Sequence, residues 1–444
     1  MIRINEFNEA KQLLTRKNTL ESFVGSLQLL AQIKRIFGEE LSPQQVVEHI
    51  VAEVKDKGDE ALFYYAGKLD GVELEFLEVT RQEILAAYES VDDGLVSALK
   101  LAAKRIRDFH FECAAKTGVV FINHYLGRQI QSLSKVGLYI PGGTAAYPST
   151  VLMTAIPANV AGVKEIIMVS PTNKDGEIPA ATLVAADVAG VHRIFRVGGA
   201  QAIAALAFGT ETIPKVDKIC GPGNIFVTLA KKVVYGAVAV DGLQGPSEIM
   251  IVADDSADPS FCTADLLAQA EHDILASPIL ITTSFDMAKQ IDKEVARQLK
   301  KLKRRSIAAQ AMNGGIIVLV DDIDEAVELV NLYAPEHLSL MIADALAALP
   351  KITNAGCIFI GENSAVALGD YVAGPSHVLP TGGSAYFNSP LGVGDFLKTS
   401  NIIAFDKATA LKLGPAAMVI AKAEGLDAHV RSVEERIRRQ GNLK

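Results

Sequence analysis

Cysteine and tryptophan are scarce in this sequence of 444 residues, which contains four cysteines and no tryptophan. The cysteines lie far apart, at Cys113, Cys220, Cys262 and Cys357, and no two of them form a Cys-x-x-Cys pair. Neither a disulfide framework nor a thiolate zinc site is therefore indicated, which fits a reducing cytosol. The N-terminus also lacks the apolar stretch of a secretory signal, so we expect a cytoplasmic protein.

Long unbroken apolar segments are lacking as well. The longest run without a charged residue, 136–163, is long enough to span a bilayer, but proline and glycine break it repeatedly. We interpret it as buried interior. Lys and Arg number 43 against 52 Asp and Glu, a net charge of −9. This balance argues against nucleic acid or an anionic membrane as the main partner and favours a small molecule.

The composition itself is typical of a large globular protein, with 49% hydrophobic and 21% charged residues. At about 100 to 200 residues per domain, the length suggests two to four domains. Residues 1–125 are charged and helix-periodic, and Ser42 and Pro43 are placed to begin one helix. After them, short apolar runs alternate with helical stretches, which predicts βαβ units and parallel sheets.

These patterns divide the rest of the chain into a first α/β lobe at 126–245, a second at 246–385 and a helical C-terminal region at 386–444. The predicted strands begin near residues 136, 165, 193, 216 and 238 in the first lobe and near 248, 278, 315 and 357 in the second. An old duplication would explain two lobes in series, although no residue-level repeat supports it. The charged last helix, 430–439, has a solvated face or packs on another subunit.

Glycine-rich turns follow three predicted strands of the first lobe, at Gly142-Gly143, Gly198-Gly199 and Gly221-Pro-Gly-Asn. Each turn precedes a predicted helix, so backbone N–H groups meet a helix N-terminus where an anion can bind. Ligands of open α/β sheets bind off the carboxyl ends of the strands, where these turns would gather. Alternatively, the glycines only permit tight turns. Neither G-x-G-x-x-G nor G-x-x-x-x-G-K-[ST] occurs, so a dinucleotide would bind without the usual fingerprint.

Two polar pairs carry residue types suited to metal binding or proton transfer. Gln269 and His272 are three residues apart on a predicted helix, so both can reach one metal or ligand, although a solvated pair has the same spacing. Pro335 is expected to end a helix and to expose Glu336-His337 at a junction. A carboxylate beside an imidazole can move protons near neutral pH, but an exposed loop pair looks the same.

Two further segments contain candidate residues. The stretch 369–383 includes Asp370 and His377 and is dense in glycine and proline. A long irregular stretch of this kind is functional or disordered, and its interleaved apolar residues favour function. The segment Glu424-Gly-Leu-Asp-Ala-His429 joins two C-terminal helices, where Asp427 can cap the last one. Its spacing does not by itself indicate a metal at His429.

In this order the motifs resemble those of histidinol dehydrogenases, the family that completes histidine biosynthesis. The resemblance runs from about residue 135 to residue 430. It is carried by Gly137-Leu-Tyr-Ile-Pro-Gly-Gly, Gly198-Gly-Ala-Gln-Ala-Ile-Ala-Ala-Leu, Gly221-Pro-Gly-Asn, Gly245-Pro-Ser-Glu, Ala268-Gln-Ala-Glu-His-Asp, Ala334-Pro-Glu-His-Leu and Gly374-Pro-Ser-His-Val-Leu-Pro-Thr-Gly-Gly. One departure is Ser376, where many members have asparagine, and it concerns only local loop contacts.

The resemblance implies two Rossmann-like, aldehyde-dehydrogenase-like three-layer α/β/α lobes with helical N- and C-terminal extensions. The first lobe would bind NAD, the second would carry the metal and catalytic residues, and 386–444 would form a homodimer with an active site shared between subunits. The implied reaction is the zinc-dependent four-electron oxidation of L-histidinol to L-histidine through L-histidinal, with one Zn²⁺ per subunit. It consumes two NAD⁺ and one water.

The resemblance also assigns individual residues. Glu336 and His337 match the proton-transfer pair. The zinc ligands would be Gln269, His272, Asp370 and His429, with His429 reaching the site from the other subunit. The substrate-binding positions are Ser247, Gln269, His272, His337, Asp370, His377, Glu424 and His429. The nucleotide contacts are Tyr139, Gln201 and Asn224. The remaining histidines, His49, His110, His124 and His192, match no motif and are read as structural or surface residues.

These residue types suit the implied chemistry. Zn²⁺ accepts N and O ligands and, with open positions, would hold histidinol by its imidazole and amino nitrogens. Proton removal from the alcohol needs a base such as His337, and the second oxidation needs a hydrated aldehyde, for which Glu336 can activate water. Two alternatives stay open: a dehydrogenase of another amino alcohol, and a two-lobed solute-binding protein, against which the missing signal peptide and Glu336-His337 speak.

Overall fold

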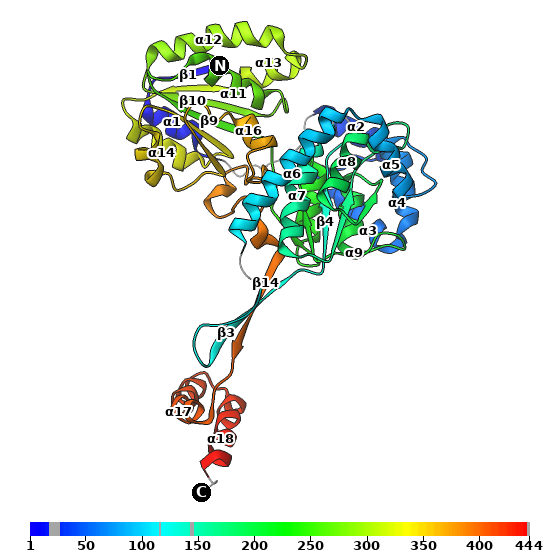
Figure 1. The fold of residues 1–444 in the computed structure, drawn as a ribbon, viewed down its shortest axis with the longest axis vertical. Helices are drawn as coiled ribbons and strands as arrows, with labels where there is room; N and C mark the ends of the chain where they lie inside the picture. The colour runs from blue at the N-terminus through cyan, green and yellow to red at the C-terminus, as the bar shows by residue number, and fades with distance from the viewer. Residues whose placement is uncertain (17–26, 115–116, 143–145, 442–444) are drawn as a thin grey trace. The chain divides into compact units, whose positions relative to one another are not determined.

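The computed structural model describes residues 1–16, 27–114, 117–142 and 146–441 (Figure 1). The chain divides into two compact units. Unit 1 comprises Met1–Ala114 and Leu133–Phe396, and unit 2 comprises Ala115–Ser132 and Leu397–Lys444. Because each unit includes segments from distant parts of the chain, the units do not correspond to consecutive sequence regions.

The first lobe of unit 1 is built on a parallel sheet with the strand order β6-β5-β4-β7-β8. Its strands are β4 (Lys135–Tyr139), β5 (Glu165–Val169), β6 (Arg193–Phe195), β7 (Lys218–Cys220) and β8 (Ala239–Val240). The connecting helices are α7 (Pro148–Ala161), α8 (Ala180–Ala189), α9 (Gly199–Phe208) and α10 (Ile225–Val234). Ten of the 14 residues of α7 and eight of the ten of α9 are buried, as expected for helices covered on both sides.

The N-terminal helices thicken the helical layers of this lobe. They are α2 (Leu27–Phe37), α3 (Pro43–Lys57), α4 (Asp59–Tyr65), α5 (Arg81–Ser90) and α6 (Asp93–Cys113), with a π-helical turn at Ala66–Asp70. Helix α3 packs on α9 and α10, whereas α5 and α6 pack on α7 and α8. As predicted, Ser42 caps α3 in a capping box and Pro43 lies in its first turn.

The second lobe repeats the same topology in a parallel sheet with the order β1-β11-β10-β9-β12-β13. Its strands are β1 (Ile2–Ile4), β9 (Glu248–Ala253), β10 (Ser277–Thr282), β11 (Ile316–Leu319), β12 (His337–Met341) and β13 (Cys357–Ile360). Its helices are α1 (Phe7–Leu14), α11 (Pro259–Ala270), α12 (Phe285–Gln298), α13 (Arg305–Gly314), α14 (Ile323–Tyr333), α15 (Ala345–Ala348) and α16 (Val366–Tyr371). Short 3₁₀ turns occupy Leu299–Lys301, Leu349–Lys351, Ser384–Tyr386 and Val393–Phe396.

Each lobe has three layers, with apolar cores on both faces of its sheet, which confirms the predicted α/β/α fold class. In the second lobe one core lies under α11, α12 and α13 and the other under α1 and α14. Leaving out the edge strand β1, both sheets have the order 3-2-1-4-5 of a Rossmann-like half. The strand order therefore reverses between β4 and β7 in one lobe and between β9 and β12 in the other.

Two terminal segments differ from the sequence expectation. The N-terminal region was expected to be helical, but Ile2–Ile4 forms β1 and pairs with β11 in parallel, which covers that edge of the sheet. The C-terminal region was also expected to be helical, but Leu397–Ile403 forms strand β14. Short strands of this kind are decided by distant pairing partners and not by local periodicity.

Unit 2 is an antiparallel sheet followed by a helical pair. Strand β3 (Leu126–Ser132) pairs with β2 (Gly118–Phe121) on one side and β14 on the other. Helix α17 (Lys407–Ala423), capped by Asp406, packs against α18 (Asp427–Gly441). Every residue of β2 is exposed, and large apolar side chains of this unit, including Phe121, Ile403 and Val419, are more than half exposed. This surface is a candidate for contact with a partner.

The four cysteines are free thiols, as the sequence indicated, with Cys220 and Cys262 buried. Among the described residues, the helices are all too short or too polar to cross a membrane. The uncharged run at 136–163 instead supplies β4 and α7 to the interior of the first lobe.

His110 gives unit 1 a pH-dependent stability. Burial lowers its pKa to about 4, although its place in the last turn of α6 favours the charged form. Between that value and the unfolded pKa of about 6.5 the unfolded chain binds a proton that the folded chain does not, so stability falls as pH drops through this window. The full shift corresponds to about 3 kcal/mol, which we reduce to roughly 1–2 kcal/mol for partial hydration. Urea unfolding at pH 7 and pH 4.5 measures the loss of unfolding free energy on acidification. This loss should be smaller by that amount in His110→Leu, and it should be unchanged in His49→Leu, because His49 is exposed.

Candidate active site

The expected proton-transfer pair lies at the edge of the second lobe's sheet where the strands begin. Glu336 immediately precedes β12, and His337 is its first residue. Strand β12 neighbours β9, with His337 in register with Ile249, so the pair lies beside Glu248, the first residue of β9. The lobe therefore presents these residues at the amino ends of two central strands.

Burial of the pair corrects one sequence expectation. Helix α14 ends before Pro335, as predicted, but Glu336 and His337 are only 6% and 4% exposed and do not form an exposed junction. The Glu336 carboxylate accepts a hydrogen bond of 2.8 Å from the backbone N–H of Glu248. A buried carboxylate held in this way keeps a fixed position relative to the imidazole beside it.

Backbone contacts determine which ring nitrogen of His337 is free. Nδ1 lies 2.9 Å from the carbonyl oxygen of Glu248, and because a carbonyl only accepts, Nδ1 carries the proton. Nε2 makes no hydrogen bond in the described part of the chain and lies 3.5 Å from a carboxylate oxygen of Asp370. In the neutral ring Nε2 therefore has a free lone pair that can accept a proton.

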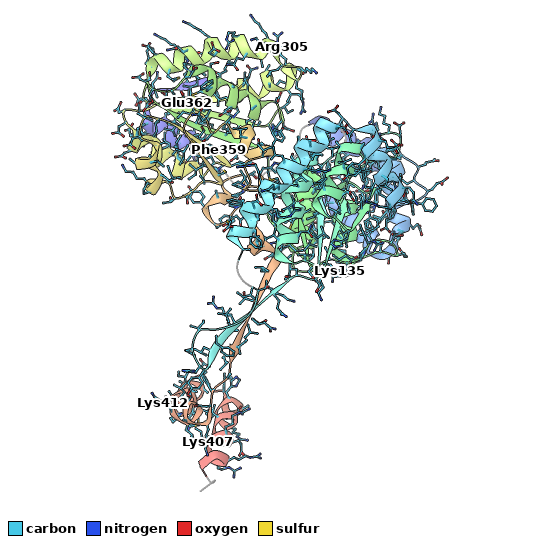
Figure 2. The ribbon with its side chains drawn as sticks, in the orientation of Figure 1. Lys135, Arg305, Phe359, Glu362, Lys407 and Lys412 are labelled. Carbon is cyan, nitrogen blue, oxygen red and sulfur yellow. The ribbon has the colours of Figure 1, made fainter. Side chains whose placement is uncertain are left out.

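The surrounding charges stabilise a proton on this ring. Burial lowers the pKa of His337, but the carboxylates of Glu336 and Asp370 raise it more, so it lies well above its ordinary value. The side of the ring is packed by Phe359 of β13, labelled in Figure 2, at 6.0 Å between ring centroids. The imidazole is thus held in place, and the nearby carboxylates stabilise the imidazolium that forms when Nε2 accepts a proton.

The expected zinc ligands of unit 1 lie in α11, in the turn after it and in α16. Asp370 lies in α16; burial raises its pKa, but the imidazoles of His337, His377 and His272 lower it more, so that it lies below its ordinary value. Gln269 in α11 is 2% exposed, and its side-chain amide has no hydrogen bond among the described residues. A buried amide without a partner has capacity to bind a further group.

His272 does not lie on the predicted helix. Helix α11 ends at Ala270, and the N–H of His272 bonds to the carbonyl oxygen of Gln269 at 3.2 Å in the following turn. The pair therefore does not share a helical face, and His272 is exposed at the surface.

The donor types around Asp370 fit zinc. Within the described ranges, His, Cys, Asp and Glu side chains form no group of three or more that could hold a metal ion. The expected set would not form such a group in unit 1, because one ligand is the amide of Gln269 and another, His429, lies in unit 2. The amide of Gln269 and the ionised carboxylate of Asp370 would offer oxygen ligands and His272 a nitrogen, which are donor types that Zn²⁺ accepts.

His377 and its loop connect the two lobes. Its Nδ1 lies 2.8 Å from the backbone carbonyl oxygen of Asp370, and its Nε2 lies 3.2 Å from the hydroxyl oxygen of Thr150 in α7. Both ring nitrogens thus have protein partners. Ser376, the departure from the family pattern, is buried and bonds to the carbonyl oxygen of Met153, so the loop accommodates it.

The remaining substrate positions lie in both units. Ser247 immediately precedes Glu248 and is partly exposed, beside the buried pair. Glu424 and His429 lie in unit 2, at the end of α17 and in the first turn of α18. Asp427 is in the first turn of α18, one position later than the cap expected from the sequence.

The expected nucleotide contacts lie at the carboxyl ends of the first lobe's strands. Tyr139 ends β4, and its hydroxyl accepts a hydrogen bond of 3.2 Å from the N–H of Gly199. Gln201 is buried in α9, and its Oε1 has no partner in the described ranges. Asn224 is exposed and caps α10, accepting from the N–H groups of Phe226 and Val227. The turns at Gly198 and Gly221 are thereby brought to one edge, whereas Gly143 lies outside the described residues.

Gly221 is required by the close approach of two of these segments. Its φ of +111° is unfavourable for other residues, and a Cβ there would lie 2.1 Å from the carbonyl oxygen of Tyr139. Its N–H bonds to Asp241, and its carbonyl oxygen accepts from Lys231, which also pairs with Asp241 at 2.7 Å. The turn at the switch point between β4 and β7 is therefore rigidly held.

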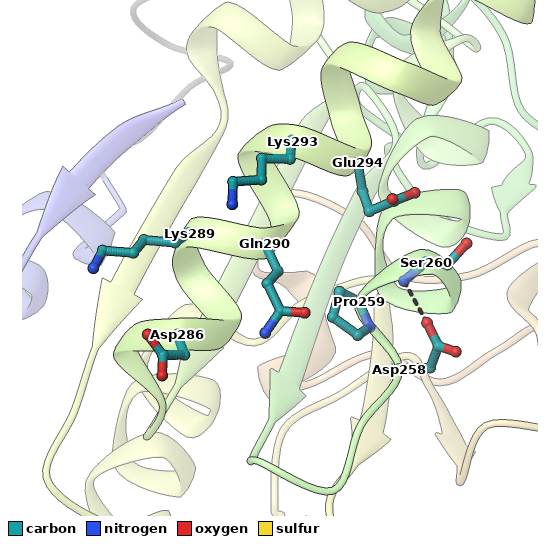
Figure 3. A pocket seen from close by; sticks show the side chains of 8 residues that line it. All are labelled: Asp258, Pro259, Ser260, Asp286, Lys289, Gln290, Lys293 and Glu294. Carbon is teal, nitrogen blue, oxygen red and sulfur yellow. Dashed lines mark hydrogen bonds between the residues drawn. The ribbon is translucent and has the colours of Figure 1, made fainter.

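A groove of about 530 Å³ elsewhere in the second lobe lacks these features (Figure 3). It lies between the start of α11 and one face of α12, and Asp258 there caps α11 through the N–H of Ser260. The lining residues are Asp258, Pro259, Ser260, Asp286, Lys289, Gln290, Lys293 and Glu294. It contains none of the expected site residues, and its open, mixed-charge surface does not indicate a reaction.

Two residues of the site were missed by sequence reasoning. Glu248, whose backbone contacts both Glu336 and His337, ends the block Gly245-Pro-Ser-Glu. In that block the family resemblance assigns a role to Ser247 alone. Asp265 lies one helical turn before Gln269, is buried, and has an oxygen without a partner among the described residues. Burial raises its pKa to about 6, with a further increase from Asp370. No spacing in the sequence singled it out.

Comparisons with a family model, with related sequences and with solved structures all point to the same family. The model of the family described as histidinol dehydrogenase matches residues 37–437. The histidinol dehydrogenase of Dehalococcoides mccartyi strain CBDB1 is 51% identical over 438 residues, which cover 98% of this chain and 99% of that protein. That of Clostridium acetobutylicum is 49% identical and covers 89% of this chain and 92% of that protein. The crystal structure of histidinol dehydrogenase from Elizabethkingia anophelis superposes with a TM-score of 0.91 at 36% identity, covering 100% of this chain and 99% of that one.

Proposed function

The chain belongs to the histidinol dehydrogenase family, and we propose that it oxidises L-histidinol to L-histidine through L-histidinal as the last step of histidine biosynthesis. Each turnover would consume two NAD⁺ and one water and release two NADH. The observation that carries the proposal is the buried Glu336-His337 pair, with the lone pair of Nε2 left free beside Asp370.

In the first oxidation, His337 accepts the hydroxyl proton at Nε2 as a hydride leaves the alcohol carbon for NAD⁺. The carboxylates of Glu336 and Asp370 support this role, because they stabilise the imidazolium that forms. Nδ1 remains bonded to the carbonyl oxygen of Glu248, so the ring does not turn as it gains the proton.

In the second oxidation, Glu336 takes a proton from the water that adds to the aldehyde carbon. The resulting hydrate has a hydrogen on carbon that leaves as a second hydride, giving the carboxylate of L-histidine. The carboxylate of Glu336 lies 3.5 Å from Nδ1 of His337, so its negative charge stabilises the imidazolium that forms when Nε2 takes a proton.

We propose one Zn²⁺ per subunit, held by Gln269, His272, Asp370 and, from the partner subunit, the residue equivalent to His429. The buried unpartnered amide of Gln269 and the ionised Asp370 support this assignment. When bound, the metal would supply a Lewis acid that orients the substrate through its nitrogens. Ser247, His377 and Glu424 would complete the substrate contacts.

We propose that NAD binds at the first lobe's carboxyl edge, near Tyr139, Gln201 and Asn224. The glycine turns there and the rigid turn at Gly221 support this location, since ligands of open α/β sheets bind at such switch points.

A homodimer with a shared active site is proposed for unit 2. The exposed apolar residues of β2, β14 and α17 are consistent with such an interface, and we keep the cytoplasmic location expected from the sequence.

Metal removal tests the proposal. Purified protein should reduce NAD⁺ with L-histidinol and form L-histidine with two NADH per product. After dialysis against a chelator the rate should fall at least about tenfold, because the ion that orients the substrate is then missing. Adding zinc should restore the rate. Unchanged activity after verified metal loss would contradict the zinc assignment. Activity with another amino alcohol but not with histidinol would contradict the substrate.

A further inference from the structure

Arg16, in the segment after α1, forms a buried ion pair with Glu248. Its two terminal nitrogens each lie 2.6 Å from a carboxylate oxygen of Glu248, an arrangement in which both donors of the guanidinium fork are used. The side chains are 19% and 7% exposed. Arg16 lies outside residues 37–437, which the family model matches, and more than 200 positions from Glu248 in sequence.

Glu248 is the residue whose backbone holds the proton-transfer pair. Its N–H donates to the Glu336 carboxylate at 2.8 Å, and its carbonyl oxygen accepts from Nδ1 of His337 at 2.9 Å. Its own carboxylate accepts from the N–H of Gly382 at 3.2 Å in addition to Arg16. A movement of Glu248 therefore moves both hydrogen bonds that orient Glu336 and His337.

Arg16 also holds the second segment that carries the pair. Its Nε donates to the carbonyl oxygen of Tyr333 at 2.7 Å, and its guanidinium carbon lies 3.8 Å from the centre of the Tyr333 ring. Tyr333 ends α14, and the left-handed Ala334 turns the chain toward Glu336. Gly383 permits this packing, because a Cβ there would lie 2.6 Å from Cδ of Arg16.

We propose that Arg16 is a positioning residue that fixes Glu336 and His337 by joining the start of β9 to the end of α14. This inference rests on the proposed function of the pair. Arg16 pairs with the buried carboxylate of Glu248, and its bidentate geometry restricts the direction of Glu248 more than a point charge would. Arg16 does not contact the reacting atoms itself.

Kinetics of three variants test the positioning role. Arg16→Met should lower kcat for histidinol roughly 30-fold, because small displacements of catalytic groups cost one to two orders of magnitude, while the KM for NAD⁺ stays within about twofold. Arg16→Lys keeps the charge but loses the bidentate fork and the bond from Nε to Tyr333, so it should recover only part of the loss. Arg3→Met is the matched control, because Arg3 lies in the same N-terminal segment and pairs with Asp292 on the surface. It should keep the wild-type kcat.

A measurement without turnover separates this inference from the proposed function. In protein labelled with ¹⁵N-histidine, and with His337 assigned from His337→Gln, Arg16→Met should shift or broaden the protonated Nδ1 signal of His337, while Arg3→Met leaves it unchanged. Wild-type kcat together with an unshifted signal in folded Arg16→Met would overturn the positioning role. If wild-type protein does not oxidise histidinol but Arg16→Met shifts the signal, the proposed function fails and the positioning role stands.

Discussion

Replacing His337 by asparagine is expected to lower kcat for L-histidinol by about 10³-fold, the loss typical of removing a general base. The asparagine amide can still donate to the carbonyl oxygen of Glu248, as Nδ1 does, so the bond that orders the start of β12 is retained. What the variant lacks is Nε2, the atom with a free lone pair beside Asp370. The loss therefore reports on proton transfer and not on folding.

Steady-state NADH formation with matched thermal unfolding measures this effect. His192→Asn serves as the control, because His192 also forms a ring-to-backbone hydrogen bond, with the N–H of Ile166, but in the first lobe. It should retain wild-type kcat. Recovery of His337→Ala by added imidazole would support the assignment, and a His337→Asn enzyme within tenfold of wild type would remove His337 as the base.

Replacing Glu336 by glutamine is expected to slow the oxidation of histidinal by about 10²- to 10³-fold while the alcohol step changes less than tenfold. Glutamine keeps an oxygen that can accept from the N–H of Glu248, so its position is preserved. Glutamine cannot take a proton from water, and this proton transfer is required only to form the hydrated aldehyde. The aldehyde intermediate should consequently accumulate.

Supplying histidinol and histidinal separately, and trapping released aldehyde with a carbonyl reagent, distinguishes the two steps. Glu362→Gln is the matched control: Glu362, labelled in Figure 2, also accepts from a backbone N–H, that of Asp258, away from the pair. It should change neither step. Poor alcohol oxidation with normal aldehyde oxidation in Glu336→Gln would reverse the proposed division between the two residues.

Sequence reasoning predicted the fold class correctly because its signal is local. Alternation of short apolar runs with helical stretches is a local pattern. The strand starts predicted near 136, 165 and 248 therefore lie within one residue of the first residues of β4, β5 and β9. The helix around Gln269 was predicted to reach Leu275, but it ends at Ala270, where the backbone turns. Edge strands β1 and β14 were missed, since their partners lie far away in sequence.

The local sequence by itself determined the class of fold. It also indicated that the cysteines are unpaired and which titratable residues lie within the motifs. The tertiary structure alone decided that Glu336-His337 is buried, that Nε2 of His337 is the free nitrogen, and that Arg16 reaches Glu248. The reason is that these features depend on the register of β9 with β12 and on contacts across more than 80 residues. Hydrophobic periodicity specifies which face of an element is buried, but not which distant backbone group meets a given side chain.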